Sequence, residues 1–240
     1  MKRTDFTLKP SLIAMLAAAT LLTACGDDDD DDTVVVTPPA PVMQTFTVTV
    51  TNLTANQPMS PVILASHASD AMLWNAGEMA SEALEKMAEA GDTADIAALS
   101  VIESSVNGTG LLMPGMSETL TLTLDEAAVA SISLATMLVN TNDAFTGINS
   151  YAIAGMEVDA TTAMKFMAYD AGTEANSEAK GTMPGPADGG EGFNASRDDV
   201  DFVHIHPGVI SMYDGLADSV LGASHRFDNP VLAVTIMRIE

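Results

Sequence analysis

The chain is short of cysteine, of aromatic residues and of positive charge. Cys25 is the only cysteine among 240 residues, so no disulfide can form within the chain. Lys and Arg number nine against 33 Asp and Glu, which gives a net charge of −24. Because this charge repels phosphates, we expect no binding to nucleic acid. Hydrophobic residues make up 47% of the chain, so an apolar core, rather than cross-links, must hold the fold together.

No apolar run at the N-terminus is long enough to cross a bilayer, which takes about 20 residues. The apolar stretch at residues 11–23 follows the basic residues Lys2, Arg3 and Lys9. This order is typical of a secretory signal. Residues 22–25, Leu-Thr-Ala-Cys, resemble a bacterial lipobox. We therefore expect residues 1–24 to be a cleaved signal peptide and Cys25 to carry the lipid anchor; the alternative is an ordinary signal peptide with a chance cysteine.

Residues 25–44 are predicted to form a linker between the lipid and a folded domain. Six consecutive aspartates at 27–32 precede a segment rich in valine and proline. Repulsion between like charges and the stiffness of prolines extend such a chain.

Removing residues 1–24 takes away three basic residues and one acidic residue, which leaves a net charge of −26. We expect a lipid-anchored protein of the cell envelope, either in the outer membrane or facing the periplasm, or exposed at the surface.

The folded part, residues 45–240, is predicted to be mainly β. Apolar and polar residues alternate with period two at 46–51, 119–124 and 232–236, the pattern of half-buried strands. Further strands are predicted at 61–66, at 131–139 and, for a shorter one, at 200–205. The stretch 131–139 is nearly all apolar and is expected at the centre of a sheet.

Two inserted helices and one long loop complete the predicted fold. Residues 71–90 have the period of an amphipathic helix that ends at Gly91, and a second short helix is expected at 93–101. Residues 171–199 are rich in Gly, Pro, Asn and acidic residues, which predicts a long loop. Many strands with one or two inserted helices favour an antiparallel β-sandwich.

Three segments of the chain resemble the spondin N-terminal domain family. The first runs from Met59 to Trp74 and contains Ser-Pro-Val-Ile-Leu-Ala-Ser-His; the second is the loop at 140–150, Asn-Thr-Asn-Asp-Ala-Phe-Thr-Gly-Ile-Asn-Ser; the third is Tyr-Asp-Ala-Gly-Thr-Glu at 169–174. They occur in the family's order. The resemblance implies a C2-like antiparallel β-sandwich of the kind found in secreted matrix and adhesion proteins.

The same resemblance implies a calcium site at the ends of loops. Asp143 and Asp170 match two of the family's acidic ligands. The third family ligand, a Glu on the preceding strand, has no counterpart here, where Leu alternates with Thr at 119–124. The alternatives to this Glu are Glu118, Asp125, a backbone carbonyl or water. This departure leaves the completeness of the calcium site open.

The residues themselves also allow a cation at the same place. Calcium takes six to eight oxygen ligands, which loops rich in Asp and Asn supply. One acidic or amide cluster follows an apolar strand, and a second lies in the long loop: Asn140, Asn142 and Asp143, then Asp170, Glu174, Asn176 and Glu178. The alternative is turn chemistry, in which Asn and Asp side chains bond to their own backbone.

His204 and His206 provide a second candidate site. The two imidazoles fall on one face of a predicted strand, with aspartates at 198, 199 and 201 nearby. With an acidic ligand they would form a zinc site, and a zinc-dependent hydrolase is the alternative function. His67 beside Ser66 lacks the sequence of a nucleophile elbow. Because no nucleophile, base and orienting group can be assembled from the sequence, we do not expect an enzyme.

The sequence thus predicts a lipid-anchored binding or adhesion module of the cell envelope. Calcium is the expected cofactor, and an extracellular protein or glycan is the expected partner besides the membrane. A metal-free structural lipoprotein is the third hypothesis.

Overall fold

The computed structural model describes residues 40–240. The predicted signal peptide at 1–24, the predicted lipidation site Cys25 and most of the predicted linker at 25–44 lie outside the described residues. None of the helices within 40–240 has both the length and the apolar character needed to span a membrane.

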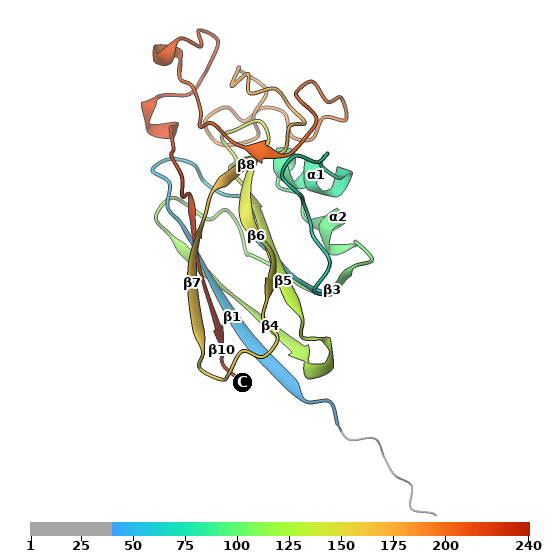
Figure 1. The fold of residues 1–240 in the computed structure, drawn as a ribbon. Helices are drawn as coiled ribbons and strands as arrows, with labels where there is room; N and C mark the ends of the chain where they lie inside the picture. The colour runs from blue at the N-terminus through green and yellow to red at the C-terminus, as the bar shows by residue number, and fades with distance from the viewer. Residues whose placement is uncertain (1–39) are drawn as a thin grey trace, which may run out of the picture. The chain divides into compact units, whose positions relative to one another are not determined.

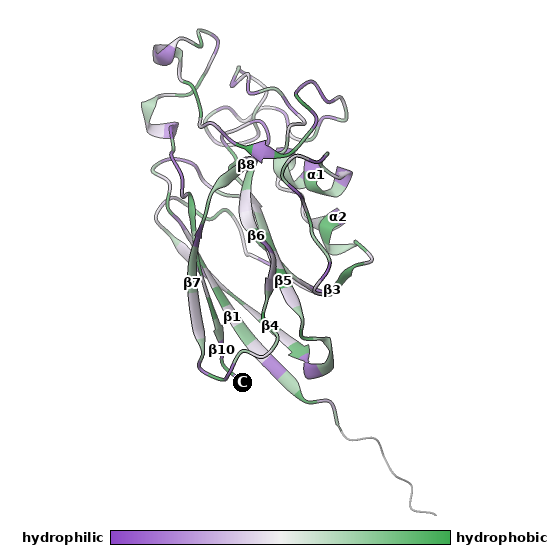
Figure 2. Ribbon diagram, viewed as in Figure 1, coloured by the Kyte–Doolittle hydropathy of each residue, from purple (hydrophilic) through white to green (hydrophobic). Residues whose placement is uncertain are grey.

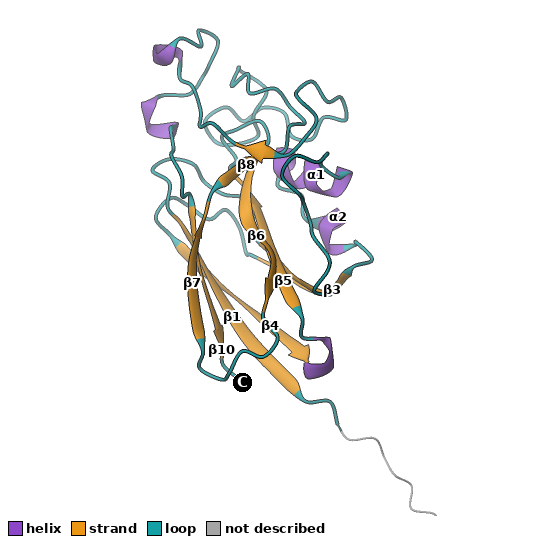
Figure 3. Cartoon of the chain, viewed as in Figure 1, coloured by secondary structure: helices purple, strands orange, loops and turns teal. Residues whose placement is uncertain are grey.

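Residues 40–240 form two antiparallel sheets that face each other as a β-sandwich, as predicted (Figures 1 and 3). One sheet has the strand order β4-β1-β10-β7 and the other the order β3-β2-β5-β6-β8-β9. The strands are β1 (Met43–Asn52), β2 (Ile63–His67), β3 (Ile102–Asn107), β4 (Ser117–Asp125), β5 (Ser131–Met137), β6 (Ala144–Ala152), β7 (Thr161–Phe166), β8 (Ala168–Asp170), β9 (His204–Ile205) and β10 (Leu232–Arg238).

Period-two alternation places the apolar side chains between the sheets. In β1, Phe46, Val48 and Val50 are buried, whereas the intervening threonines are partly exposed on the outer face. The alternating segments of β4 and β10 contribute leucine, valine and isoleucine side chains to the same core. Every residue of β5 is buried, and β5 lies between β2 and β6, which confirms the central strand predicted at 131–139.

Two helices cover the outer face of the second sheet, and the first begins later than predicted. Helix α1 spans Glu82–Ala90 and α2 spans Ala94–Ala97. Ser81 caps α1 by accepting a hydrogen bond from the Leu84 amide at 3.2 Å, and Gly91 ends it in the left-handed conformation. The predicted helical start at residue 71 is wrong.

The segment before α1 is held in an irregular conformation by a residue distant in sequence. The Leu73 amide donates to Asn149 Oδ1 at 2.9 Å, and Asn149 Nδ2 donates to the carbonyl of Trp74. Gly77 adopts a φ of 89°, which interrupts a helix. Trp74 therefore reaches the core beside α1 from a loop, not from a helix.

Two other predictions near the candidate sites also need correction. The strand predicted at 200–205 is limited to β9, two residues long. Most of the stretch at 140–150, predicted as a loop, belongs to β6, where it pairs with the buried strand β5. The long loop at 171–199 is confirmed, since neither helix nor strand lies between β8 and β9.

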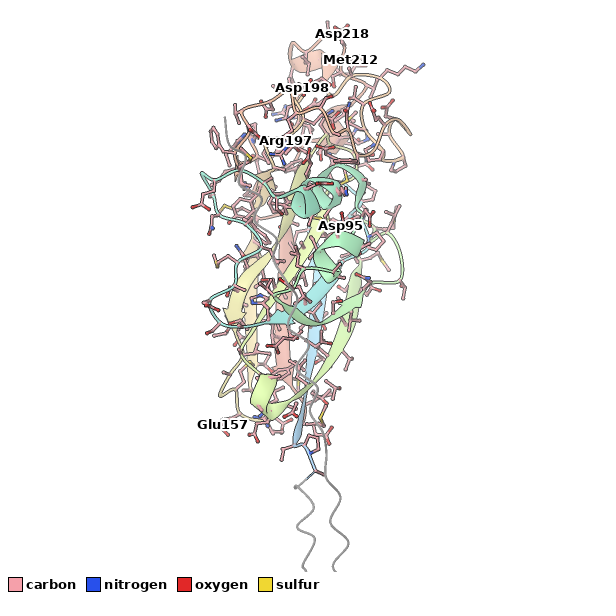
Figure 4. The ribbon with its side chains drawn as sticks, turned by 90° about the vertical axis from the view of Figure 1, so that its right-hand side faces the viewer. Asp95, Glu157, Arg197, Asp198, Met212 and Asp218 are labelled. Carbon is pink, nitrogen blue, oxygen red and sulfur yellow. The ribbon has the colours of Figure 1, made fainter. Side chains whose placement is uncertain are left out.

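The two ends of the sandwich differ in character. At one end, called the loop end here, β6 begins, β8 ends, and the loops 138–143 and 171–203 lie together (Figure 1). At the opposite end, called the far end, β1 begins beside the short 3₁₀ helix η1 (Glu126–Ala128). Asp198 and Asp218 lie at the loop end, and Glu157 lies at the far end (Figure 4). The loops beyond β8 contain both hydrophilic and hydrophobic segments (Figure 2).

Candidate metal centre

Asp143 lies buried at the loop end, directly before β6. Its Oδ2 accepts hydrogen bonds from the amides of Thr173 at 2.8 Å and Glu174 at 3.1 Å, and from the Thr173 hydroxyl at 3.2 Å. Its Oδ1 is buried and has no hydrogen-bond partner among the described residues. One oxygen of this carboxylate thus fastens the 171–203 loop, and the other remains available to a cation.

Asp170, the last residue of β8, is equally buried and lies beside Asp143. The β6–β8 ladder pairs Asp170 with Ala144, the residue after Asp143. Asp170 Oδ1 accepts from the Gly172 amide at 2.8 Å, and Oδ2 accepts from Asn176 Nδ2 at 2.6 Å. The structure therefore brings together the two acids that the sequence places at separate loop ends.

Burial and mutual repulsion make this end unfavourable for negative charge. Burial, followed by the neighbouring Asp170 charge, raises the pKa of Asp143 to about 8, although the amides of Glu174 and Thr173 oppose the rise. Burial also raises the pKa of Glu174 to about 7. Glu174 Oε2 is a second buried oxygen without a partner in the described part of the chain. A divalent cation would offset the repulsion and supply the missing partner.

Both candidate histidines lie against Asp170. His204 pairs with Asp170 across β8 and β9, and its Nε2 is 3.5 Å from Asp170 Oδ1. His206 Nε2 lies 3.9 Å from Asp170 Oδ2 and 3.1 Å from Asn176 Oδ1, and His206 Nδ1 accepts from the Gly208 amide. Burial lowers the pKa of His206 to about 4, so this ring is neutral at physiological pH.

The other predicted ligands occupy different positions. Asn140 and Asn142 are buried at the loop end, where their side-chain oxygens accept from the amides of Ala187 at 3.0 Å and Glu178 at 3.1 Å. These bonds fasten the 171–203 loop to the end of the sandwich and are not the local turn bonds of the turn-chemistry alternative.

Glu118 and Asp125 lie on β4, in the other sheet. The Glu118 carboxylate accepts from the amide and hydroxyl of Thr109, and Asp125 caps η1 at the far end by accepting from the Ala127 amide. Neither carboxylate joins the hydrogen bonds around Asp143 and Asp170. Glu174 reaches Asp143 through its backbone amide, whereas its carboxylate interacts with Asn142, Glu89, Asp198 and Glu191.

Two acids at this end were not among the predicted calcium ligands, although Asp199 was named beside the two histidines. Asp199 offers an oxygen to a cluster with Asp170 and His204, in which one ligand atom from each residue lies within 4.8 Å of the others. Glu89 of α1 is buried, with Oε2 accepting from the Asn194 amide at 2.8 Å and Oε1 unpartnered among residues 40–240. The sequence gives no sign of Glu89, because a Glu among other charged residues of a helix is usually solvated.

Comparison with known proteins agrees with this architecture. A model of the Spondin_N family matches residues 49–183, which is more than half of the chain. A search of curated proteins finds no significant match. The matched range includes Asp143, Asp170 and Glu174 but stops short of Asp199, His204 and His206. The length of the match shows that the chain belongs to the spondin N-terminal domain family.

Proposed function

We propose that this protein is a calcium-dependent binding module that a lipid anchor holds in the cell envelope. Calcium would bind the neighbouring carboxylates of Asp143 and Asp170, recruit Glu174 from the adjoining loop and so order the loop end. The ordered surface would bind an extracellular protein or glycan. Membership of the spondin family indicates a binding or adhesion-type module. The calcium, the anchor and the partner are the specific parts of the proposal.

The observation that carries the calcium assignment is the unpartnered Oδ1 of Asp143. The oxygen is fully buried, next to a second buried carboxylate, and it accepts no hydrogen bond within residues 40–240. Leaving such a group without a partner costs about 1–3 kcal/mol, and more when it is charged. Glu174 adds a second unpartnered oxygen, and the amide of Glu174 donates to the same Asp143 carboxylate.

The donor set matches calcium better than softer ions. Asp143, Asp170 and Glu174 present only carboxylate oxygens, from the start of β6, the end of β8 and the loop after it. Calcium prefers hard oxygen ligands in an irregular shell of six to eight, and water completes such a shell. Ligands on separate segments explain how binding would stiffen the loop end.

The direction of the chain supports an outward-facing site. Strand β1 begins at the far end, where Met43 pairs with Asp125, and runs toward the loop end. A lipid on Cys25 would therefore attach to the far end through the linker. The calcium-ordered loops lie at the opposite end of the domain from that attachment, which would leave them free for an extracellular partner.

The surface at the loop end supports binding to a protein or glycan. Exposed apolar side chains are frequent in the segment 200–213: Val200, Phe202, Ile205, Ile210, Met212 and Tyr213. A cavity of about 320 Å³ is lined by Trp74, Asn75 and Tyr169 among others. Exposed apolar and aromatic groups with amides nearby are typical of recognition surfaces.

We further propose that the protein binds without catalysing a reaction. The chain does hold a serine–histidine pair, since His67 Nε2 lies 2.7 Å from Ser133 Oγ. Both residues are fully buried, and Ser133 also accepts from the Ser150 amide. A nucleophile has to meet its substrate, so this pair supports a structural role.

The test is thermal unfolding of the metal-free protein with and without calcium, repeated on Asp143→Asn, Asp170→Asn and Glu174→Gln. A ligand that binds only the folded state stabilises it by about 2.7 kcal/mol at a hundredfold excess over its Kd. We expect a calcium-dependent rise in Tm that each substitution abolishes or strongly reduces.

Glu157→Gln, an exposed change at the far end, is the matched control and should retain the full rise (Figure 4). No rise in the unmodified protein would leave a metal-free structural lipoprotein as the better hypothesis. A rise that survives all three substitutions would place the calcium elsewhere.

A further inference from the structure

A second group of ligand atoms lies on the outer side of Asp170. Asp170, Asp199 and His204 each place one ligand atom within 4.8 Å of the others. Asp170 is fully buried, whereas Asp199 and His204 are partly exposed, so the cluster lies where buried acid meets solvent. It combines a ring nitrogen with two carboxylates, unlike the all-oxygen set of Asp143, Asp170 and Glu174.

Backbone pairing fixes these side chains before any ion binds. The β8–β9 ladder places His204 directly opposite Asp170. The loop that carries Asp199 is fastened to the residues after β8, because the Asp198 amide donates to the Thr173 carbonyl at 3.1 Å and the Asp201 amide donates to the Gly172 carbonyl at 2.8 Å. The Phe202 ring packs edge-on against His204 at a centroid distance of 5.6 Å. The cluster is thus preformed.

The hydrogen bonding of His204 leaves Nε2 facing acceptor oxygens. His204 Nδ1 lies 3.1 Å from the Ile205 carbonyl, which can only accept, so Nδ1 carries the proton. Nε2 lies 3.5 Å from Asp170 Oδ1, which already accepts from the Gly172 amide. The ring nitrogen and two carboxylates thus converge on one space, where a cation would hold them together.

The separation of His204 Nε2 and Asp170 Oδ1 fits a small ion. Two ligands bound tetrahedrally at about 2.1 Å lie about 3.4 Å apart, close to the observed 3.5 Å. One imidazole with carboxylates suits zinc and similar transition ions, whereas calcium selects oxygen. His206 is excluded as a ligand, because both of its ring nitrogens already have partners in Gly208 and Asn176.

We propose that Asp170, Asp199 and His204 form a second cation site that takes a zinc-class divalent ion, with water in the open positions. The site shares Asp170 with the proposed calcium site, but it does not depend on calcium binding there. Asp170 lies within the range matched by the family model, whereas Asp199 and His204 lie beyond it. Its ion would join the end of β8 to the 171–203 loop.

The test is a calorimetric titration of the purified, metal-free protein with zinc, in calcium-containing buffer. We expect one zinc ion to bind to the unmodified protein. Its affinity for His204→Ala and for Asp199→Asn should be at least about tenfold lower, which is the low end of the loss caused by disturbing a metal site. Both variants should keep the calcium-dependent rise in Tm, so failure here is distinct from failure of the calcium site. His225→Ala, which removes an imidazole from another loop, is the control.

Imidazole NMR supplies a second measurement that does not depend on affinity. Zinc should shift the His204 Nε2 resonance and leave that of His206 in place. Unchanged zinc affinity in His204→Ala would overturn the proposal, as would release of one calcium for each zinc bound, which would mean a single shared site. Absence of zinc binding to the unmodified protein would overturn it too and leave His204 and Asp170 as an ion pair.

Discussion

The two ends of the sandwich use the same residue type, aspartate, in opposite ways. At the far end, Asp125 terminates β4, is partly exposed, and caps η1 by accepting from the Ala127 amide at 3.0 Å. At the loop end, Asp143 precedes β6, is fully buried, and leaves Oδ1 without a partner in the described structure. Asp125 is satisfied by its own turn and by water, whereas Asp143 is not satisfied by the protein alone.

This difference separates what the fold needs from what a ligand provides. A buried, unpaired carboxylate weakens the folded state. The sandwich body tolerates it because the apolar core between the sheets stabilises the fold independently. We therefore expect core substitutions to change stability without changing the response to calcium, and substitutions at Asp143 to change both.

The largest expected effect comes from the core at the far end. Phe46 is fully buried between the sheets and pairs with Leu122 and Arg238 in the neighbouring strands. Phe46→Ala should lower the free energy of unfolding by about 3–5 kcal/mol, because it removes apolar contacts and leaves a cavity. Chemical denaturation measures the loss.

Calcium should raise the stability of Phe46→Ala by the same increment as that of the unmodified protein, since distant sites are additive. Phe46→Leu is the milder variant if the alanine does not fold. A smaller calcium increment in either variant would mean that the core and the loop end are coupled, against the comparison drawn above.

An intermediate effect is expected from pH in the metal-free protein. The folded pKa of Asp143 is raised to about 8 by burial and by Asp170. A raised pKa means that the folded state holds its proton more tightly, so stability is fully present below the unfolded pKa and falls as pH rises toward 8. The slope contributed by one such proton is at most about 1.4 kcal/mol per pH unit.

Asp143→Asn should flatten this decline. The measurement is denaturation between pH 5 and pH 9 in the presence of a chelator. This range covers the decline, because the pKa of Asp143 is about 4 in the unfolded state and about 8 in the folded state. Calcium should act in the opposite sense: the ion needs the ionised carboxylate, so its stabilisation should grow as pH rises. A decline of equal slope in Asp143→Asn would assign the titration to another acid, such as Glu178, whose pKa burial raises to about 7.

The sandwich was predictable from sequence because its signals are local. The alternation at Phe46, Val48 and Val50 indicates a strand with one buried face, and the apolar run of β5 indicates a strand buried on both faces. Neither pattern depends on residues far along the chain. The start of α1 was mispredicted because Asn149, far along the chain, holds Leu73 and Trp74 out of a helix. Tertiary contacts there override a helical period.

The candidate site was predictable in part, and for a related reason. Family resemblance pointed to Asp143 and Asp170, but their juxtaposition depends on the β6–β8 ladder. The cluster with His204 depends on the β8–β9 ladder and on the loop that returns Asp199 to it. The residues next to Glu89 in its charged helix do not indicate that its side chain is buried. Pairing between distant segments decides which acids meet, and composition reveals only that acids are plentiful.

The smallest effect should come from the acids on β4. Asp125→Asn keeps an oxygen to accept from the Ala127 amide, so we expect stability to change by less than about 1 kcal/mol, the typical contribution of a capping side chain. Glu118→Gln likewise keeps an acceptor for Thr109. Both should retain the full calcium-dependent rise in Tm, because their carboxylates contact β4 and its neighbouring turns and not the loops at Asp143. If either variant lost that rise, the third acid of the calcium site would lie on β4, where the missing family Glu was first sought, and Glu174 would be only its neighbour.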